Sequence, residues 1–557
     1  MRSWFVLVLV AATACTTPAA GKIRFLAQPP IWRVDDVRSL AKKPEERVYN
    51  RTLYQIDGFV VRRVTRTMDF PSNGRALDVN SLDEVPDSSW FTNRIGVRDI
   101  PISELRRGPN KDDSPFAHLP WTITGGKVGG LSLGFVIEDA TKQKYLLKFD
   151  VRDRPEMETA AHIIGHRLLW AAGYNVPQDH VGYITRDDLL LSPKATAKDA
   201  LGTKTPLLVD RIDKGLETVF KMTDGRYRVL VSRFIEGTPI GPASREGTRP
   251  DDPNDRVPHE RRRTIRGQVP LFSWINHTDI QEDNSLDAYV TEEGSKDRGH
   301  VVHYLIDFGK AFGVINNSNN WKTAGYAYRL DIGRGLLTLL SLGLWNRPWD
   351  EIDSPGLVGI GVFEANHFEP AIWRTNSPYW PFDDADQYDG FWGAKLAMRF
   401  TRAHIEAAVD EAKLSDPRAA RYMVDTLVAR QRKVAQHWFA KVSPLDHFTV
   451  TPANTGTVTL CFDDLALMYG IERVPGRYEI SVFGRDSRDL APALPAGAGS
   501  SANAGHACTE VALATSSEQY TIVKIVALRG AAIRPPVRVH LARTASGEVE
   551  VIGLRRD

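Results

Sequence analysis

The sequence has little cysteine, no long apolar run beyond its first residues, and no block of one charge. Three cysteines occur among 557 residues, and no cysteine or histidine spacing typical of a zinc site is present. No later stretch reaches the roughly 18 apolar residues that a membrane span needs. The 71 basic and 69 acidic side chains nearly cancel. Nucleic acid is therefore not expected as a partner, because phosphate binding needs clustered lysine and arginine.

Two short segments look exceptional but have simple interpretations. The run Arg261-Arg262-Arg263 lies in a helix-like stretch, where it predicts a solvated face rather than a binding patch. Residues 335–345 are apolar but too short to cross a bilayer, and they predict a buried core helix. The chain length exceeds what one hydrophobic core supports, so we expect about two to four domains.

The N-terminus has the pattern of a secretory signal. Arg2 precedes an apolar segment at 4–10, small residues fill 11–14, and Cys15 follows. Small residues directly before a cysteine resemble a bacterial lipobox, although Ala12 stands where such boxes usually carry leucine. We therefore predict a signal segment at 1–20, export, and a lipid anchor at Cys15 that attaches the protein to the membrane of a bacterial cell envelope. The alternative is an ordinary signal peptide cleaved nearby.

The remaining chain divides by its pattern of apolar residues. The expected fold class is α+β, with a β-rich lobe, a helical lobe and a C-terminal all-β, sandwich-like module. An N-terminal extension of unknown role precedes them, with a strand-like piece at 59–61. The expected ranges are 21–115 for the extension, 116–238 for the β-rich lobe, 239–445 for the helical lobe and 446–557 for the β module.

The C-terminal module contains the other two cysteines. Strands are predicted around 458–462, 478–482, 522–528 and 537–541, with a loop at 491–505. Cys461 and Cys508 are an even pair in this module. A disulfide between them would stabilise the module by about 4 kcal/mol in the chain-entropy model. Two buried free thiols are the alternative, and the sequence leaves both open.

Two motifs in the helical lobe carry chemistry. A buried strand delivers Asp307 at its end, followed by Phe308 and Gly309. A carboxylate at a strand end can hold a metal ion that is bound to phosphates. Upstream, the polar stretch NHTDIQEDN contains Asp279 and Asn284, five residues apart. In phosphoryl transfer an aspartate accepts the hydroxyl proton, and a nearby asparagine holds a second metal ion.

The β-rich lobe supplies the complementary cations and glycines. Lys148 lies in a predicted strand at 144–149, where a lysine can neutralise phosphate charge. Pro155 opens a helix that runs to 172, and Glu158 in its first turn can hold that lysine, with Glu156 as the rival. A glycine-rich hairpin precedes them, in which backbone N–H groups can approach phosphate. Its glycines are Gly125, Gly126, Gly129 and Gly130.

In this order the motifs resemble the protein-kinase-like superfamily over residues 116–445. His277, Asp279 and Asn284 have the H-x-D-x-x-x-x-N spacing, and a D-F-G follows. The motifs most resemble those of the HipA-type kinases and of the phosphoinositide-kinase-like branch. His277 stands where the HipA-type kinases carry asparagine. No A-P-E element is found. The resemblance implies a two-lobed kinase-like fold, ATP, Mg²⁺ or Mn²⁺ held by Asn284 and Asp307, and an adenine-reading segment at 232–237 that includes Glu236.

Several functions stay open at this point. The first is ATP-dependent phosphotransfer to a hydroxyl of a protein, lipid or glycan. The second is an inactive kinase-fold scaffold of the envelope, and the third is transfer of another part of the nucleotide. The G-x-S-x-G pattern at 130–134 is set aside, because a serine hydrolase needs a helix after its serine and a strand is predicted instead.

The predicted anchor is testable by one substitution. Cys15→Ser removes the sulfur atom that would carry the lipid, so the mature protein should move from the membrane fraction to the soluble fraction. The measurement is fractionation followed by immunoblotting. A variant that stays in the membrane fraction would show that Cys15 is not the anchor.

Overall fold

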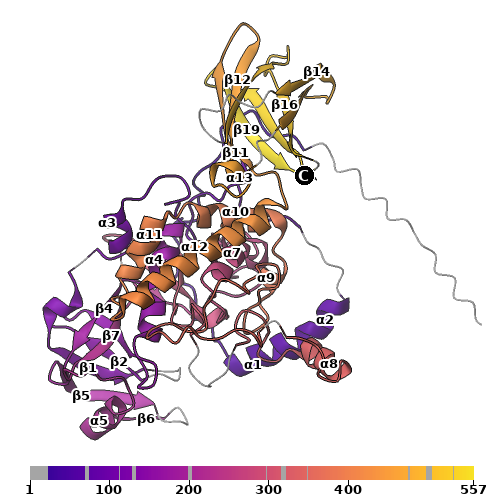
Figure 1. Cartoon of the computed structure of the whole chain (residues 1–557). Coiled ribbons are helices and arrows are strands. Elements are labelled where there is room, and N and C mark those ends of the chain that lie inside the picture. Colours follow the sequence, from indigo (N-terminus) through magenta and orange to yellow (C-terminus); the bar gives the residue numbers. More distant parts are fainter. Residues whose placement is uncertain are drawn as a thin grey trace, which may run out of the picture.

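The chain folds into a mixed α+β structure with one seven-stranded mixed sheet and several smaller antiparallel sheets (Figure 1). This computed structural model describes residues 23–557, except 69–73, 112, 128–132, 199–202, 296–297, 315–321, 348, 474–476, 497–504 and 531. Cys15, Gly129 and Gly130 therefore lie outside the described residues. The α+β class expected from the sequence is confirmed.

The seven-stranded sheet contains the strand that carries Lys148. Its strand order is β4-β7-β3-β2-β1-β5-β6, and only β1 and β5 among the paired strands run parallel. Alternating apolar side chains such as Phe135, Ile137 and Leu147 build its core. The strands are β1 (Trp121–Gly126), β2 (Gly134–Glu138), β3 (Lys144–Phe149), β4 (Asp179–Ile184), β5 (Leu189–Lys198), β6 (Lys204–Pro206) and β7 (Tyr227–Arg233), and α5 (Val209–Leu216) lies among them.

Helix α4 (Met157–Ala172) carries Glu158 and is buried along almost its whole length. Asp150 fixes its start, since one carboxylate oxygen accepts hydrogen bonds from the backbone N–H groups of Glu158 and Thr159 at 2.9 and 3.0 Å. The helix begins two residues later than Pro155, because Glu156 is its N-cap with a φ of 65°. Gly173 ends it at a φ of 133°.

The middle of the chain combines a small sheet with packed helices. Strand β9 (Ser285–Thr291) lies between β8 (Thr238–Pro239) and β10 (Gly299–Leu305). The helical pattern expected at 401–441, with a break near 415–417, is confirmed by α11 and α12. The helices are α6 (Arg263–Arg266), α7 (Gln268–Trp274), α9 (Trp380–Asp383), α10 (Gln387–Met398), α11 (Arg402–Asp410) and α12 (Pro417–Phe439), with short 3-10 turns at His259–Arg261 and Glu282–Asn284.

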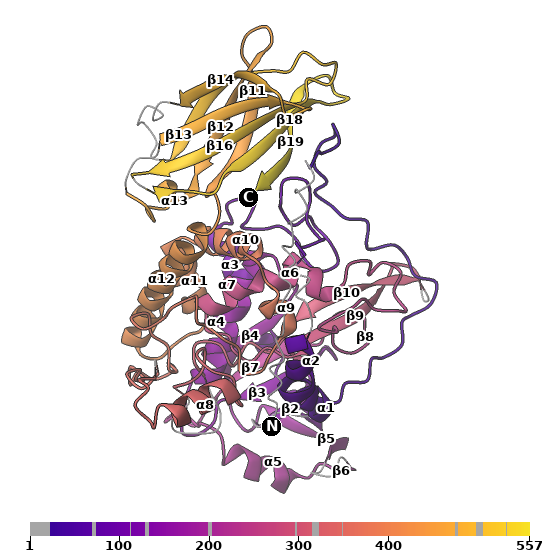
Figure 2. The same ribbon diagram turned by 90° about the vertical axis from the view of Figure 1, so that its right-hand side faces the viewer.

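Residues after 445 form two antiparallel sheets, at the opposite end of the molecule from the seven-stranded sheet (Figures 1 and 2). Apolar side chains from both sheets, such as Leu460 and Val523, share one core. The expected loop at 491–505 is wrong in its first part, because 491–496 belong to β14 and pair with β13. The elements are β11 (Leu445–Pro452), β12 (Thr457–Asp464), α13 (Leu465–Met468), β13 (Arg477–Gly484), β14 (Asp489–Ala496), β15 (His506–Ala512), β16 (Thr521–Arg529), β17 (Ala532–Ile533), β18 (Val537–Arg543) and β19 (Val549–Arg556).

The N-terminal extension runs along the whole molecule. It contacts the β module through Phe25, passes β10 at Leu40, and then descends to α1 (Figure 2). The strand expected at 59–61 is wrong: α1 (Arg51–Ile56), a π-helical segment (Asp57–Val61) and α2 (Arg62–Met68) form a continuous helical stretch. Asn50 caps this stretch, and its side chain accepts from the N–H of Leu53. Two further short elements follow, α3 (Ile102–Arg107) and a 3-10 turn at Pro115–His118.

The expected core helix at 335–345 is also wrong. Helix α8 (Ile332–Leu340) contains no buried residue, and Leu340 is 79% exposed. Apolar composition alone cannot say whether another element covers a helix, and here none of the described elements does so. None of the helices in the described part of the chain has the length and apolar character needed to span a bilayer.

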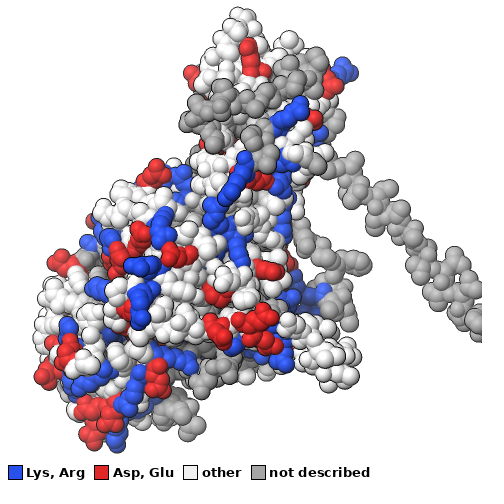
Figure 3. Space-filling model, in the orientation of Figure 1, with Lys and Arg blue, Asp and Glu red and all other residues white. Residues whose placement is uncertain are grey.

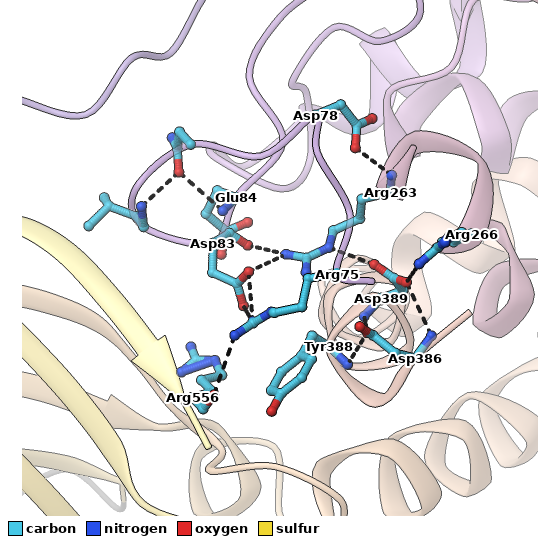
Figure 4. Close-up of polar contacts among 12 residues, drawn as sticks. Arg75, Asp78, Asp83, Glu84, Arg263, Arg266, Asp386, Tyr388, Asp389 and Arg556 are labelled. Carbon is cyan, nitrogen blue, oxygen red and sulfur yellow. Dashed lines mark hydrogen bonds and ion pairs between the residues drawn. The ribbon is translucent and has the colours of Figure 1, made fainter. Parts of the chain in front are cut away.

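Arg262 and Arg263 are buried, which contradicts the solvated face expected for 261–263, and Arg263 belongs to a buried charge cluster (Figure 4). Arg263 is fully buried, with its guanidinium 3.0 Å from Asp389 and 2.8 Å from Asp83. Burial alone would lower the pKa of this guanidinium, but the two carboxylates raise it above its ordinary value. Arg75 continues the cluster from Asp83, at 3.2 Å, toward the backbone of Arg556 in β19.

This cluster joins three distant parts of the chain: the extension, the middle helices and the last strand. Elsewhere the surface charges are mixed, and basic and acidic side chains alternate over the face drawn in Figure 3. The arrangement agrees with the near-zero net charge of +2.

Asp389 has two functions in the cluster, as a counterion of Arg263 and as part of the α10 capping box. Replacing it by Asp389→Asn should lower the free energy of unfolding by about 3–5 kcal/mol, because a fully buried arginine loses one of its two counterions. Urea unfolding followed by circular dichroism measures the change. The control is Glu406→Gln, in the exposed pair with Arg402, which should cost about 0.5 kcal/mol or less. Equal effects of the two substitutions would contradict a structural function of the cluster.

Candidate active site

Three segments from different parts of the chain meet at one ion pair. Lys148 lies in β3, and its ammonium group is 2.9 Å from Oδ1 of Asp307. Asp307 follows the end of β10 by two residues. The lysine side chain is 7% exposed, whereas that of the aspartate is 43% exposed. The pair therefore joins the seven-stranded sheet to the small sheet and leaves part of the carboxylate open to a ligand.

The backbone around Asp307 is held in an unusual conformation. Its φ is 62°, in the left-handed region that non-glycine residues seldom adopt. The next residue, Phe308, is 1% exposed and packs against rings of His162 and His166 in α4. Gly309 lies so close to α4 that a Cβ atom would be 2.8 Å from Cγ of Glu158. Packing on both sides thus fixes the direction of the Asp307 side chain.

Both members of the ion pair stay charged. Burial raises the pKa of Asp307, but the positive charge and hydrogen bond of Lys148, helped by the charge of Lys127, outweigh burial and hold this pKa well below its usual range. For Lys148, burial lowers the pKa, but Asp307 and Glu158 reverse the effect, and the net direction is upward. A carboxylate that remains ionised at every physiological pH is a suitable ligand for a divalent cation.

Glu158 forms an ion pair with a lysine that the sequence did not predict. Its Oε2 lies 3.1 Å from the ammonium group of Lys310, the residue directly after the D-F-G. Its charge also contributes to the raised pKa of Lys148, so it acts on both lysines. The carboxylate of Glu156, the rival candidate, instead accepts a hydrogen bond from the backbone N–H of Ser415 at 2.9 Å.

The polar loop at 276–284 is connected directly to the strand that bears Asp307. The backbone carbonyl of Asn284 accepts a hydrogen bond from Ile306 at 3.0 Å. The side-chain amide of Asn284 donates to the backbone carbonyl of Asp279. Because that bond uses the amide nitrogen, the amide oxygen of Asn284 is the atom suited to bind a cation. The three candidate residues therefore share one local network.

Asp279 is partly buried, with 16% of its side chain exposed. Its Oδ1 accepts a hydrogen bond from the side-chain amide of Gln281 at 2.8 Å and lies 3.7 Å from the guanidinium of Arg329. His277, two residues earlier, is 2% exposed, and burial lowers its pKa to about 4. A neutral, enclosed imidazole agrees with an orienting function for His277 rather than proton transfer.

The N-terminal extension reaches this loop. The side-chain nitrogen of Gln55 in α1 donates a hydrogen bond to the side-chain oxygen of Gln281 at 2.7 Å. The side-chain nitrogen of Gln281 in turn donates to Asp279. Arg47 forms an ion pair with Glu282 at 2.7 Å. Sequence patterns could not assign residues 21–115 a function, because these contacts join positions more than 200 residues apart. The structure gives the extension a clear place, against the loop that contains Asp279.

The glycine-rich hairpin is described only in part. Gly125 and Gly126 lie in β1, and a Cβ atom on Gly126 would be 2.9 Å from that of Ala197 in β5. Close packing against β5 is thus one physical reason for a glycine at 126. The next residue, Lys127, was missed by sequence reasoning. Burial lowers its pKa, the positive charge of Lys148 adds to this effect, and its own charge helps to hold the pKa of Asp307 low.

Glu236 lies apart from the ion pair. It is exposed in the segment after β7, where it lines a cavity of about 540 Å³ together with Phe234 and Tyr304. Neither Lys148 nor Asp307 lines that cavity. The structure therefore brings Lys148, Glu158, Asp279, Asn284 and Asp307 together and places Glu236 at a neighbouring position.

The donor set suits a metal-bound polyphosphate. Carboxylate and amide oxygens of Asp307 and Asn284 are ligands that Mg²⁺ or Mn²⁺ prefers, and Lys148 and Lys127 offer positive charge to phosphate. Each of these side chains belongs to the described network around Asp307. Sequence comparison adds no further assignment: no protein-family model matches this chain, and no curated protein matches it.

Proposed function

We propose that this chain is an ATP-dependent, kinase-like phosphotransferase that transfers a phosphoryl group to an unknown hydroxyl acceptor. In this proposal 116–238 and 239–445 are the two lobes of a kinase-like fold. The observation that carries it is the 2.9 Å ion pair between Lys148 and Asp307, because it lies beside the loop that holds Asp279 and Asn284. The proximity of motifs separated by 159 positions in the sequence supports the proposal, because phosphoryl transfer needs these groups together.

Each residue has a defined function in the proposal. A bound magnesium or manganese nucleotide supplies the phosphoryl group and the charge of the metal ion. Asp307 and Asn284 hold the metal ion through oxygen atoms, and Lys148 binds phosphate oxygens. Glu158 keeps Lys148 positively charged, as its effect on the pKa of that lysine supports. Asp279 accepts the proton from the acceptor hydroxyl.

Export and lipid anchoring through Cys15 remain part of the proposal, with the acceptor a protein, lipid or glycan hydroxyl of the envelope. The competing scaffold function predicts the same fold but no turnover. Analysis of the products formed from labelled ATP would also separate phosphoryl transfer from transfer of another part of the nucleotide.

Three substitutions test the proposed assignments. Asp307→Ala should abolish metal-dependent ATP binding, because it removes the metal ligand. Asp279→Ala should leave ATP affinity nearly intact but lower the transfer rate by about 100-fold or more, the scale of a lost general base. Lys148→Met should weaken transfer more than binding. Calorimetry with ATP and Mg²⁺ or Mn²⁺ measures the affinity, and a labelled-transfer assay measures the rate.

Asp283→Asn is the matched control, because it alters another carboxylate of the same loop. The Asp283 carboxylate contacts Arg51 and does not contact Asp279. It should retain most of the transfer rate. Wild-type protein that neither binds ATP with a divalent metal ion nor turns it over would contradict the phosphotransferase proposal and favour the scaffold function. Turnover unaffected by Asp279→Ala would show that the base is another residue.

The amide relay from α1 gives a second test. Gln55→Ala removes one hydrogen bond to Gln281, worth about 1 kcal/mol, and this corresponds to a fall in the transfer rate of about fivefold. Nucleotide affinity should not change, because Gln55 contacts Gln281 and none of the residues proposed to bind the nucleotide. Gln55→Glu should lower the rate further, since its carboxylate attracts the Gln281 nitrogen and turns the Gln281 oxygen toward Asp279.

Steady-state kinetics separates these effects from general damage to α1. Leu53→Ala, at an exposed position of the same helix, should change neither the transfer rate nor the nucleotide affinity. If Leu53→Ala and Gln55→Ala lower the rate equally, α1 matters only as a folded element and the relay has no function.

A further inference from the structure

The outer face of the C-terminal sheet carries reactive side chains that the proposed function does not use. In the antiparallel pair β12·β15, Cys461 lies opposite Cys508 and Asp463 lies opposite His506. Alternation along both strands directs these four side chains away from the core, which Leu460, Phe462 and Ala507 occupy. The result is a compact group of sulfur, imidazole and carboxylate on an accessible surface.

The group is arranged more closely than strand pairing alone requires. The two cysteines form a disulfide, as one of the two alternatives from the sequence predicted. Nε2 of His506 is 3.5 Å from Sγ of Cys508, and Nδ1 of the same ring is 2.8 Å from the carboxylate of Asp463. One ligand atom from each of Cys461, His506 and Cys508 lies within 4.8 Å of the others.

We propose that reduction of the Cys461–Cys508 disulfide turns this group into a binding site for a thiophilic cation such as Zn²⁺. Two thiolates and one imidazole are a common set of protein ligands for zinc, and three protein ligands leave a fourth position for water or a further ligand. The inference rests on residues of the β module alone and is independent of the proposed phosphotransfer.

The distances are compatible with such a site. Zinc–sulfur bonds of about 2.3 Å in a tetrahedral site separate two sulfurs by about 3.8 Å. The disulfide therefore excludes the ion, and its cleavage allows the sulfurs to move apart. The backbones already hold the cysteines as neighbours, with Cα atoms 4.0 Å apart, so rotation of the side chains completes the set without moving the strands.

Asp463 supplies the support that metal-binding histidines usually have. Its contact with Nδ1 fixes the His506 ring and leaves Nε2 as the atom that faces the sulfurs. His447, at the irregular step between β11 and β12, contacts the other oxygen of the same carboxylate at 2.9 Å. A carboxylate bound on both sides keeps one orientation, and it can therefore hold the ligand ring in place.

The chemistry balances with a thiol as reductant. Two equivalents of a small thiol, or one protein dithiol, donate two electrons and two protons to the disulfide and are themselves oxidised to a disulfide. The resulting thiols then release two protons as one Zn²⁺ binds. In an oxidising compartment the disulfide persists and the site stays closed, so metal binding reports the redox state of the surroundings.

The test uses the full mature chain, oxidised or reduced with a phosphine, and titrated with Zn²⁺ against a chromophoric chelator. Reduced wild type should bind one equivalent, with native mass spectra showing the gain of one zinc and the loss of two protons. Zinc should also protect both thiols from alkylation. Oxidised wild type should bind no zinc at this site. Asp463→Asn should weaken binding by about 10-fold or more, the scale for a residue that supports a metal-binding histidine.

His506→Ala should weaken binding more than Asp463→Asn, since it removes a ligand. Glu510→Gln, on the same outer face two residues beyond Cys508, is the matched control and should bind as wild type does. Circular dichroism checks that every reduced protein stays folded. The proposal is overturned if reduced, folded wild type binds no zinc, if His506→Ala binds it equally well, or if the disulfide cannot be reduced without unfolding the module.

Discussion

A buried ammonium group requires a counterion, and in this protein that requirement joins two sheets. Removing a charged group from water costs several kcal/mol unless an opposite charge is close. Lys148 finds this charge in Asp307, which comes from a different sheet. The side chain of Asp307 reaches the lysine from a left-handed backbone conformation, stabilised by the buried ring of Phe308 and by the absence of a side chain at Gly309. The geometry of the candidate site thus follows from the need to neutralise one lysine.

The N-terminal extension supplies counterions to a second set of buried cations, and these contacts join distant parts of the chain. Its carboxylate at Asp83 pairs with the guanidinium of Arg263 in the middle helices, and that of Asp78 accepts a hydrogen bond from the backbone N–H of Arg263. Arg75 extends the cluster toward the last strand. Farther down, α1 contacts the loop of Asp279 through Gln55 and Gln281. The extension therefore connects the middle helices to the last strand, and it also contacts the loop on which the proposed general base lies. Loss of the extension would affect fold and site together.

Local patterns in the sequence predicted what local physics determines. Patterns of apolar residues located β3, β12, β13, β16 and β18, and the motifs around Asp307 and Asp279 identified residues that the fold brings together. Features that depend on distant partners were missed or wrong. Arg263 was expected in solvent because its counterions, Asp83 and Asp389, lie 180 and 126 positions away. The predictions of a buried helix at 335–345 and of a strand at 59–61 were also wrong, because apolar residues alone do not reveal which other elements lie against them. Lys310 was not predicted as a partner of Glu158, because only the turn at Gly309 brings it to α4.

The balance of charge at the site indicates what kind of ligand would complete it. Lys127, Lys148 and Lys310 surround the carboxylates of Asp307 and Glu158, so positive groups outnumber negative ones before Asp279 is reached. Burial lowers the pKa of Lys127, which means that its charge is poorly compensated within the protein. An anionic ligand would relieve that excess, and the exposed part of Asp307 would still offer an oxygen atom to a cation. A polyphosphate with a divalent metal ion carries both charges in one ligand, whereas a neutral substrate would leave the lysines uncompensated. The charges around Asp307 therefore suit the metal-bound nucleotide that we propose better than an uncharged small molecule.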